Sequence, residues 1–182
     1  MKPEQFYGYC GLPATYASRT FKPSEYMTPK VLQFGLDWCD KRDKESLILQ
    51  GNVGSGKTYF MCCLINNLLN RGHTWLQFKK SSTLDREFLE AVSGKSDCSL
   101  TDLMSKYKEV PIFFWDDIGT ERVSERVERE FLEIIDYRLD ADMPIVFTTN
   151  LDFEKLEERL GERISSRLQK PKWLSFKSGD MR

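Results

Sequence analysis

The sequence predicts an α/β fold with a central parallel β-sheet, and three stretches of the chain support this prediction. A glycine-rich loop, residues 51–58, stands between an apolar strand and an amphipathic helix. One apolar run, 110–115, ends in two carboxylates, and another, 144–148, ends at Thr149 and Asn150. Buried parallel strands are continuous apolar runs, and ligands bind beyond their carboxyl ends. We therefore expect the functional side chains at one edge of the sheet.

The glycine-rich loop has the chemistry of a phosphate-binding loop. Its sequence, Gly-Asn-Val-Gly-Ser-Gly-Lys-Thr, matches the pattern G-x-x-x-x-G-K-[ST]. Glycines allow positive φ angles and let backbone N–H groups point at phosphate oxygens, and the following helix adds the positive end of its dipole. Lys57 is placed to reach the β- and γ-phosphates, and the Thr58 hydroxyl to ligate Mg²⁺. The predicted nucleotide-binding residues are Gly51, Asn52, Val53, Gly54, Ser55, Gly56, Lys57, Thr58 and Tyr59.

The other elements follow from hydrophobic spacing. Residues 1–30 are rich in aromatic residues and proline, and we expect them to cover the core with little regular structure. Helices are predicted at 31–39, 59–70, 84–92, 101–108, 125–139, 156–160 and 162–169, and strands at 46–50, 73–78, 110–115, 144–148 and 173–176. We expect a domain at 46–182, on which an extended and helical segment, 1–45, packs.

Two residues mark the predicted boundary between the helix 59–70 and the strand 73–78. Gly72 stands where a helix C-cap belongs. His73 is the one histidine of the sequence, and we expect it to begin a strand rather than to act as a base.

Three polar residues follow the apolar strands. Asp116 is expected to hold Mg²⁺ opposite Thr58, and Asp117 to polarise the attacking water as general base. Asn150, at the tip of the strand 144–148, is placed to bond to the γ-phosphate or the lytic water. Each has a structural alternative, because the aspartates could form a strand-ending turn and Asn150 could cap the next helix.

Composition limits the class of protein. Of the 182 residues, 40% are hydrophobic and 30% are charged, which is typical of a globular domain. No apolar run has the length of a membrane span and the first residues do not resemble a signal peptide, so we expect a cytoplasmic protein with no membrane partner. The five cysteines form no C-x-x-C pair, which favours reduced thiols over disulfides or a zinc site.

The formal net charge of −1 argues against electrostatic binding of nucleic acid by the whole molecule. Any contact with DNA must come from a local patch. Lys79 and Lys80, expected where the chain leaves the strand 73–78, are together with Arg86 the best candidates to contact DNA phosphates. The alternative is an ordinary solvated loop.

Four motifs together resemble the AAA+ core of the bacterial DnaC and DnaI helicase loaders and of the related IstB transposition ATPases. They are the phosphate loop, Trp-Asp-Asp-Ile-Gly at 115–119, Thr-Thr-Asn at 148–150 and Leu-Gly-Glu-Arg-Ile-Ser-Ser-Arg-Leu at 160–168. Gly-Leu-Pro at 11–13 with Phe21, and the closing segment 176–182, are similar to the first and last segments of that family. The resemblance covers the chain from about residue 11 to the end.

The resemblance implies a three-layer P-loop ATPase of the AAA+ type, with a parallel five-stranded sheet and no helical lid domain. It implies binding of ATP, ADP and Mg²⁺, and action as an oligomer on a replicative helicase and single-stranded DNA. Asn150 becomes the sensor of the γ-phosphate. Asp117 stands where many AAA+ proteins have Glu, so we expect slow turnover. Family loaders usually carry a separate N-terminal domain, whereas about 45 mostly irregular residues precede the first strand here.

The same resemblance gives two arginines a role at a subunit interface. Arg167 becomes the arginine finger that one subunit inserts into the site of its neighbour, and Arg163 is a second candidate. The alternative for both is a solvated helix face paired with Glu157, Glu158 or Glu162.

Three other functions stay open at this point. An IstB-like ATPase would be the same kind of enzyme, acting on a transposase instead of a helicase. A small-molecule or nucleotide kinase could use the same loop, although no arginine-rich lid or second substrate pocket is visible in the sequence. A nucleotide-binding subunit without hydrolysis is the third alternative.

Overall fold

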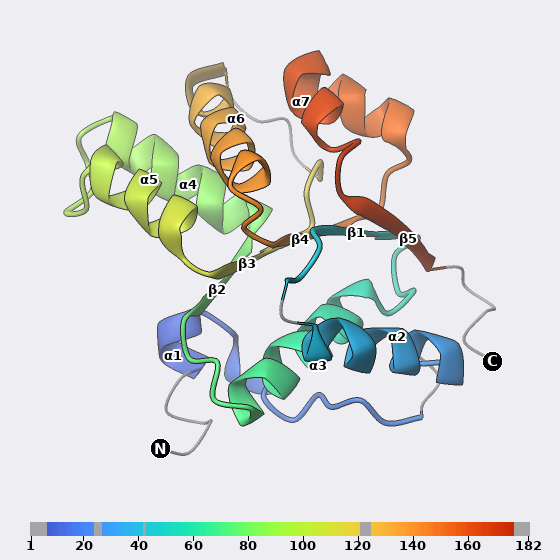
Figure 1. The fold of residues 1–182 in the computed structure, drawn as a ribbon. Coiled ribbons are helices and arrows are strands. Elements are labelled where there is room, and N and C mark those ends of the chain that lie inside the picture. Colours follow the sequence, from blue (N-terminus) through green and yellow to red (C-terminus); the bar gives the residue numbers. More distant parts are fainter. Residues whose placement is uncertain (1–6, 24–26, 42, 121–124, 177–182) are drawn as a thin grey trace.

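The computed structural model describes residues 7–23, 27–41, 43–120 and 125–176. Five parallel strands form one sheet in the order β2-β3-β4-β1-β5. Helices α4 to α7 cover one face of this sheet and α1 to α3 the other (Figure 1), so the predicted three-layer α/β fold is confirmed. The strands are β1 (Leu47–Gly51), β2 (Leu76–Lys80), β3 (Ile112–Asp116), β4 (Ile145–Thr149) and β5 (Lys172–Phe176). The helices are α1 (Tyr7–Cys10), α2 (Pro29–Asp40), α3 (Lys57–Asn70), α4 (Ser81–Val92), α5 (Leu100–Glu109), α6 (Glu125–Asp140) and α7 (Phe153–Arg167), with a 3₁₀ turn at Ala14–Tyr16.

The strand order decides which side chains meet. β4 lies between β1 and β3, although it follows both in the sequence. Its carboxyl end therefore stands between the loop that leaves β1 and the acidic end of β3. Because all five strands are parallel, these three ends lie at the same edge of the sheet.

Alternation along the strands divides the core into two layers. In β3, Phe113 and Trp115 face the helices α4 to α7, whereas Phe114 faces α2 and α3. Successive side chains of a strand point to opposite faces, so each strand contributes to both layers. The strands β1, β3 and β4 are buried along nearly their whole length, as their continuous apolar sequence predicts.

Polar caps fix the starts of three helices. The side chains of Thr28, Ser99 and Asp152 accept hydrogen bonds from the backbone at the first turns of α2, α5 and α7. Gly72 has a φ of 87° just after α3, and its N–H donates to the Leu69 carbonyl, as expected for a C-cap glycine. The cap of α7 is thus Asp152, and the alternative role of Asn150 as a cap is wrong.

Two predicted boundaries need correction. The strand predicted at 73–78 begins only at Leu76 and runs to Lys80, so His73 lies in the turn after α3 and does not begin the strand. Lys79 and Lys80 consequently belong to β2 itself, and α4 begins directly after them. The predicted helices at 156–160 and 162–169 form one element, α7, with a kink at Gly161. Residues 121–124, just before the predicted helix 125–139, and residues 177–182 of the closing segment lie outside the described residues.

The segment before β1 packs against the α3 face of the sheet and against β2. Asn66 of α3 donates two hydrogen bonds, to the carbonyls of Tyr16 and Arg19, at 2.8 and 2.7 Å. Gln77 of β2 donates to the Cys10 carbonyl at 3.0 Å. These contacts attach the chain between α1 and α2 to the core and cover part of the free edge of β2.

A buried arginine joins the helices α5 and α6 to the sheet. Arg138, in the last turn of α6, is fully buried and donates hydrogen bonds to five backbone carbonyls. The acceptors are Tyr107, Lys108, Val110, Pro111 and Pro144, at 2.7 to 3.3 Å. Burial lowers the pKa of this guanidinium to about 10. The group therefore satisfies carbonyls that end α5 and precede β3 and β4.

The five cysteines all lie in the described part of the chain and form no disulfide; Cys98 is exposed and the others are buried. Burial raises the pKa of Cys39 and of Cys63 to about 12, so these thiols stay protonated at neutral pH. Within the described part of the chain, no helix has both the length and the apolar character needed to cross a membrane.

Candidate nucleotide-binding site

The glycine-rich loop connects β1 to α3 in the way that its sequence predicts. Gly56 has a φ of 90° and caps the amino end of α3. At Gly51 a β-carbon would collide with the Phe176 carbonyl and lie 2.8 Å from the Ser55 hydroxyl, so only glycine fits. The loop thus places backbone at the positive end of a 14-residue helix, the arrangement that binds phosphate groups.

Lys57 lies inside the loop and is only 6% exposed. Its ammonium group donates to the carbonyls of Gly51 and Asn52, at 2.6 and 2.8 Å, and to the Oδ1 atom of Asn150, at 2.7 Å. The bond to Asn150 joins the loop to the tip of β4. The sequence-predicted lysine and asparagine therefore meet, although 93 positions separate them.

Asp116, at the end of β3, is 2% exposed and accepts two hydroxyl hydrogen bonds on Oδ1. One comes from Thr58 at 2.9 Å and the other from Thr148 of β4 at 2.7 Å. The residue after it, Asp117, has a φ of 66°, a left-handed conformation that is uncommon outside glycine. Its Oδ1 accepts a hydrogen bond from the Asn150 side chain at 3.1 Å.

Burial shifts the pKa of Lys57 and of Asp116 toward the neutral form, and neighbouring groups modify both shifts. Burial lowers the pKa of Lys57, while the charges of Asp117 and Asp116 raise it. Burial also raises the pKa of Asp116, which the hydroxyls of Thr148 and Thr58 lower and the charge of Asp117 raises further. The site thus holds one ammonium group and two carboxylates in a mostly buried cluster, an environment common at functional sites.

The residues at this edge fit Mg²⁺ in the manner of a nucleotide-dependent site. Thr58 and Asp116 present a hydroxyl and a carboxylate oxygen 2.9 Å apart, and oxygen is the ligand that Mg²⁺ prefers. No group of three or more His, Cys, Asp or Glu residues within the described ranges could hold a metal by itself. Mg²⁺ is commonly bound through one or two protein side chains together with substrate phosphates, which matches this donor set.

The comparison with known families decides the assignment of the chain. The family described as "IstB-like ATP binding protein" matches residues 15–167, which include the phosphate loop, both aspartates and Asn150. The chain belongs to this family. It is a family of ATP-binding proteins of the AAA+ class, as the motifs predict.

Individual relatives come from both branches of the resemblance. The replicative helicase loader DnaC of Escherichia coli is 26% identical over 124 residues, 68% of this chain and 50% of the loader. An ATP-binding protein of insertion sequence IS1162 from Pseudomonas fluorescens, described as putative, is 29% identical over 110 residues, 60% of this chain and 45% of that protein. The chain therefore spans about half the length of the curated relatives that it matches.

A solved structure supports the fold. The crystal structure of DnaI superposes with a TM-score of 0.75 and 22% sequence identity, over 91% of this chain and 93% of that chain. At this identity the likeness concerns the fold alone.

Both candidate arginine fingers of this family member lie on the exposed side of α7. Arg163 and Arg167 line a hollow between α6 and α7 together with Leu132, Glu162 and Ser166. Arg167 forms an ion pair with Asp136 of α6, and its side chain is 44% exposed. Its ion-pair partner is therefore on the neighbouring helix and not one of the glutamates of α7. Within the described residues, no hydrogen bond or ion pair joins either arginine to the site residues Lys57, Thr58, Asp116, Asp117 and Asn150.

The remaining sequence-predicted residues, Tyr59, Lys79 and Lys80, each have different surroundings. Tyr59 of α3 lies under the guanidinium of Arg19, 5.2 Å from the ring centroid, so it faces the segment before β1. Lys79 forms an ion pair with Glu87 of α4, whereas Lys80 is exposed and pairs in register with Asp116. The two lysines thus differ, and only Lys80 has an exposed side chain at the carboxyl edge of β2.

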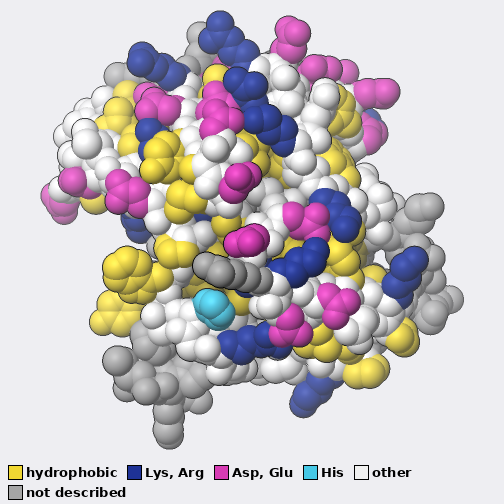
Figure 2. Space-filling view, viewed as in Figure 1, with side chains coloured by type: hydrophobic (Ala, Val, Ile, Leu, Met, Phe, Trp, Pro, Cys, Tyr) yellow, Lys and Arg dark blue, Asp and Glu magenta, His cyan; other side chains and the backbone are white. Residues whose placement is uncertain are grey.

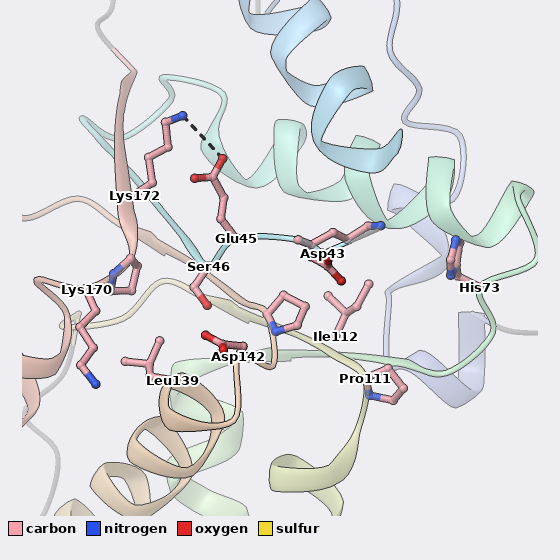
Figure 3. Close-up of a pocket in the computed structure, with 13 residues that line it drawn as sticks. Asp43, Glu45, Ser46, His73, Pro111, Ile112, Leu139, Asp142, Lys170 and Lys172 are labelled. Atoms are coloured by element: carbon pink, nitrogen blue, oxygen red, sulfur yellow. Dashed lines mark ion pairs between the residues drawn. The ribbon is translucent and has the colours of Figure 1, made fainter. Parts of the chain in front are cut away.

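The hollow drawn in Figure 3 does not lie at this site. It is lined by residues at the amino ends of β1, β3, β4 and β5, the opposite edge of the sheet. Figure 3 shows Lys172 directed at Glu45, with which it forms an ion pair of 3.6 Å. Lys170 is paired with Asp140. Basic and acidic side chains are likewise interspersed over this side of the molecule (Figure 2), so no single-sign patch marks a ligand.

The sequence reasoning missed one residue that the geometry places at the centre of the site. Thr148 is 1% exposed and bonds both to the Asp116 carboxylate and to the Asp117 N–H. In the sequence it is a β-branched residue near the end of an apolar strand, where threonine needs no special explanation. The signal that could have found it is its spacing of two residues from Asn150, which in an extended strand places both side chains on the same face.

Proposed function

We propose that this chain is an ATP-dependent switch of the helicase-loader type. It binds MgATP at the carboxyl edge of the sheet, hydrolyses it slowly, and transmits its nucleotide state to a replicative helicase and single-stranded DNA. The observation that carries the proposal is the hydrogen-bonded set Lys57, Asn150 and Asp117, which stands beside the pair Thr58 and Asp116. These are the groups needed to bind a γ-phosphate and to activate water, held within one connected site.

Each residue has a separate part in hydrolysis. Lys57 binds phosphate oxygens once these replace the carbonyl and amide oxygens that it now contacts. Mg²⁺, held by Thr58 and Asp116, would neutralise charge on the phosphate oxygens. Asp117 accepts a proton from the attacking water as general base. Asn150 contacts both Lys57 and Asp117, so a change at the γ-phosphate alters the position of the base.

The partner protein on which this ATPase acts is the more specific part of the proposal. The relative from Escherichia coli, DnaC, is named a replicative helicase loader, which supports a helicase as the partner of this chain. The insertion-sequence relative supports a second candidate, a transposase client. The kinase alternative is less favoured because Asn150 would then contact the reactive groups without a role. A measurement of ATP turnover decides whether the chain is instead a nucleotide-binding subunit without hydrolysis.

Helicase loading tests the proposed client. The purified chain is mixed with the replicative helicase of the bacterium in which the chain occurs, circular single-stranded DNA and ATP, and the amount of DNA-bound helicase is measured after gel filtration. We expect the amount of loaded helicase to rise with ATP and to fall to background with Lys57→Ala. No gain of loaded helicase, with a stimulated transposase in a parallel strand-transfer assay, would favour the insertion-sequence client instead.

We expect the site to be completed by a second subunit. Among the described residues, the set Lys57, Thr58, Asp116, Asp117 and Asn150 holds no second cation for charge that develops on the transferred phosphoryl group. An arginine supplied in trans is worth about 10³ to 10⁵ in rate. Arg167→Ala should bind ATP normally and lose about 10³-fold or more in hydrolysis. Mixing it with Lys57→Ala should restore activity, because a mixed interface pairs an intact loop with an intact arginine. Parental hydrolysis by Arg167→Ala, or no recovery at any mixing ratio, would show that Arg167 is not the finger.

The contact with single-stranded DNA is predicted to involve Lys80 more than Lys79. Lys80→Ala should reduce the slope of log affinity against log salt by about 0.7, the value for one single-strand phosphate contact. Lys79→Ala is the matched control, because Lys79 is already paired with Glu87 and should change the slope less. Fluorescence anisotropy with labelled oligonucleotides at several salt concentrations measures both slopes. Unchanged slopes in both variants would place the DNA site elsewhere.

A further inference from the structure

Thr148 occupies a position that links the two aspartates of the site. Its hydroxyl donates to Asp116 Oδ1 at 2.7 Å and accepts from the Asp117 N–H at 2.7 Å. A hydroxyl is the smallest side-chain group that donates and accepts at once. The two carboxylates belong to adjacent residues, so one oxygen atom fixes the side chain of the first and the backbone of the second.

The pairing of β4 with β3 explains why Thr148 reaches both aspartates. In β4 Val146 packs in the core layer next to α3, and Thr148, two positions later, points to the same face. Asp116 stands two positions after Phe114, which also belongs to that layer. Because β4 pairs with β3, the hydroxyl of one strand and the carboxylate of the other meet on the face that carries Thr58.

Strand alternation alone would point Asp117 away from that face. Its left-handed conformation, φ 66°, breaks the alternation and brings its carboxylate to the Asn150 side chain. A non-glycine residue in this conformation costs free energy and persists where its surroundings hold it. Thr148 supplies two such restraints, because its hydroxyl binds the Asp117 N–H and its carbonyl binds the Ile118 N–H at 2.8 Å.

We propose that Thr148 is a positioning residue, which holds the Asp116 carboxylate ready for Mg²⁺ and holds Asp117 in its turned conformation. The inference rests on the proposed nucleotide site. If the Thr58 hydroxyl ligated Mg²⁺ it would do so through an oxygen lone pair, and its proton could still be donated to Asp116 Oδ1. The bond from Thr148 would be the second one that orients this carboxylate. Thr148 itself contacts neither phosphate nor metal in this role.

The test measures how much Mg²⁺ strengthens ADP binding, by calorimetry in EDTA and in Mg²⁺. Thr148→Val removes the hydroxyl and keeps the branched shape, and should lower this Mg²⁺ enhancement by about tenfold or more, the usual effect of a lost bond to a charged group. ADP binding in EDTA should change little, which also shows that the variant is folded. Thr148→Ser keeps the hydroxyl and should restore the enhancement to within about twofold.

Thr149→Val is the matched control. Thr149 is equally buried on the same strand, but its hydroxyl donates to the Ile118 carbonyl and touches no carboxylate. It should lose stability as Thr148→Val does while keeping the Mg²⁺ enhancement. A double-mutant cycle adds a second readout, because Thr148→Val should have no further effect on the enhancement in an Asp116→Asn background.

The proposal is overturned if Thr148→Val keeps the parental Mg²⁺ enhancement, if Thr149→Val loses as much, or if the effects of Thr148→Val and Asp116→Asn simply add. Neither hydrolysis nor a helicase enters this measurement. A protein that binds MgADP but loads no helicase would therefore contradict the proposed function and leave the role of Thr148 supported by its own result.

Discussion

We expect Lys57→Ala to lower the affinity for ATP by about 100- to 1,000-fold, because the substitution should remove about 3–4 kcal/mol of binding free energy. The loss corresponds to two charge-assisted hydrogen bonds to phosphate, each worth about 1.5–3 kcal/mol. Lys57 is held by the Gly51 and Asn52 carbonyls at the place where phosphate would bind, so little reorganisation is needed for it to act. Calorimetric titration with ATP in Mg²⁺ measures the change.

A distant lysine separates this effect from a general loss of charge. Lys44→Ala also removes an ammonium group bonded to a backbone carbonyl, that of Lys41, but it lies in the hollow at the opposite edge of the sheet. Its affinity for ATP should equal that of the parent. If Lys57→Ala binds ATP as the parent does while remaining folded, the loop is not the nucleotide site.

We expect Arg138→Met to lower the free energy of unfolding by about 3–5 kcal/mol, because five backbone carbonyls lose their hydrogen bonds to the guanidinium. Methionine fills most of the volume but donates no hydrogen bond. The carbonyls end α5 and begin β3 and β4, so the loss falls where three elements meet. Urea unfolding, followed by tryptophan fluorescence, measures the change.

The control for this variant is on the same helix. Arg129 of α6 is exposed, and Arg129→Met should change the stability by no more than about 0.5 kcal/mol. Arg138→Lys tests the geometry, since a lysine keeps the charge but cannot present the planar set of donors to five acceptors. A stability of Arg138→Met equal to that of Arg129→Met would show that water replaces the guanidinium without cost.

The order of the elements and the chemistry of the loop could be predicted because they depend on local pattern. The loop 51–58 and the aspartates after β3 are fixed by short spacing and by strands that are apolar throughout. Local pattern was a poorer guide at β2. Trp75 was expected inside the strand, but it is 77% exposed and precedes it, since an alternating run does not define where pairing with β3 begins.

The contacts within the site could not be predicted in the same way. That β4 lies between β1 and β3 is a property of non-local pairing, and it brings Asn150 to Lys57 and Thr148 to Asp116. Arg138 gave no signal either, because a charged residue near the end of an amphipathic helix is usually solvated. Thr148 and Arg138 form hydrogen bonds with polar groups that become buried only when the chain folds.

The central claim is that the residues around Lys57 form an ATPase in which Asp117 activates water. Phosphate release and retained ATP, measured together on the parent and on Asp117→Asn at saturating MgATP, test it most directly. Asn keeps the size of the side chain and removes the base, so the parent should release phosphate, faster with single-stranded DNA, while Asp117→Asn binds ATP equally well and retains it unhydrolysed. Equal phosphate release by the two proteins, or bound ATP that the parent never hydrolyses with or without DNA, would contradict the account.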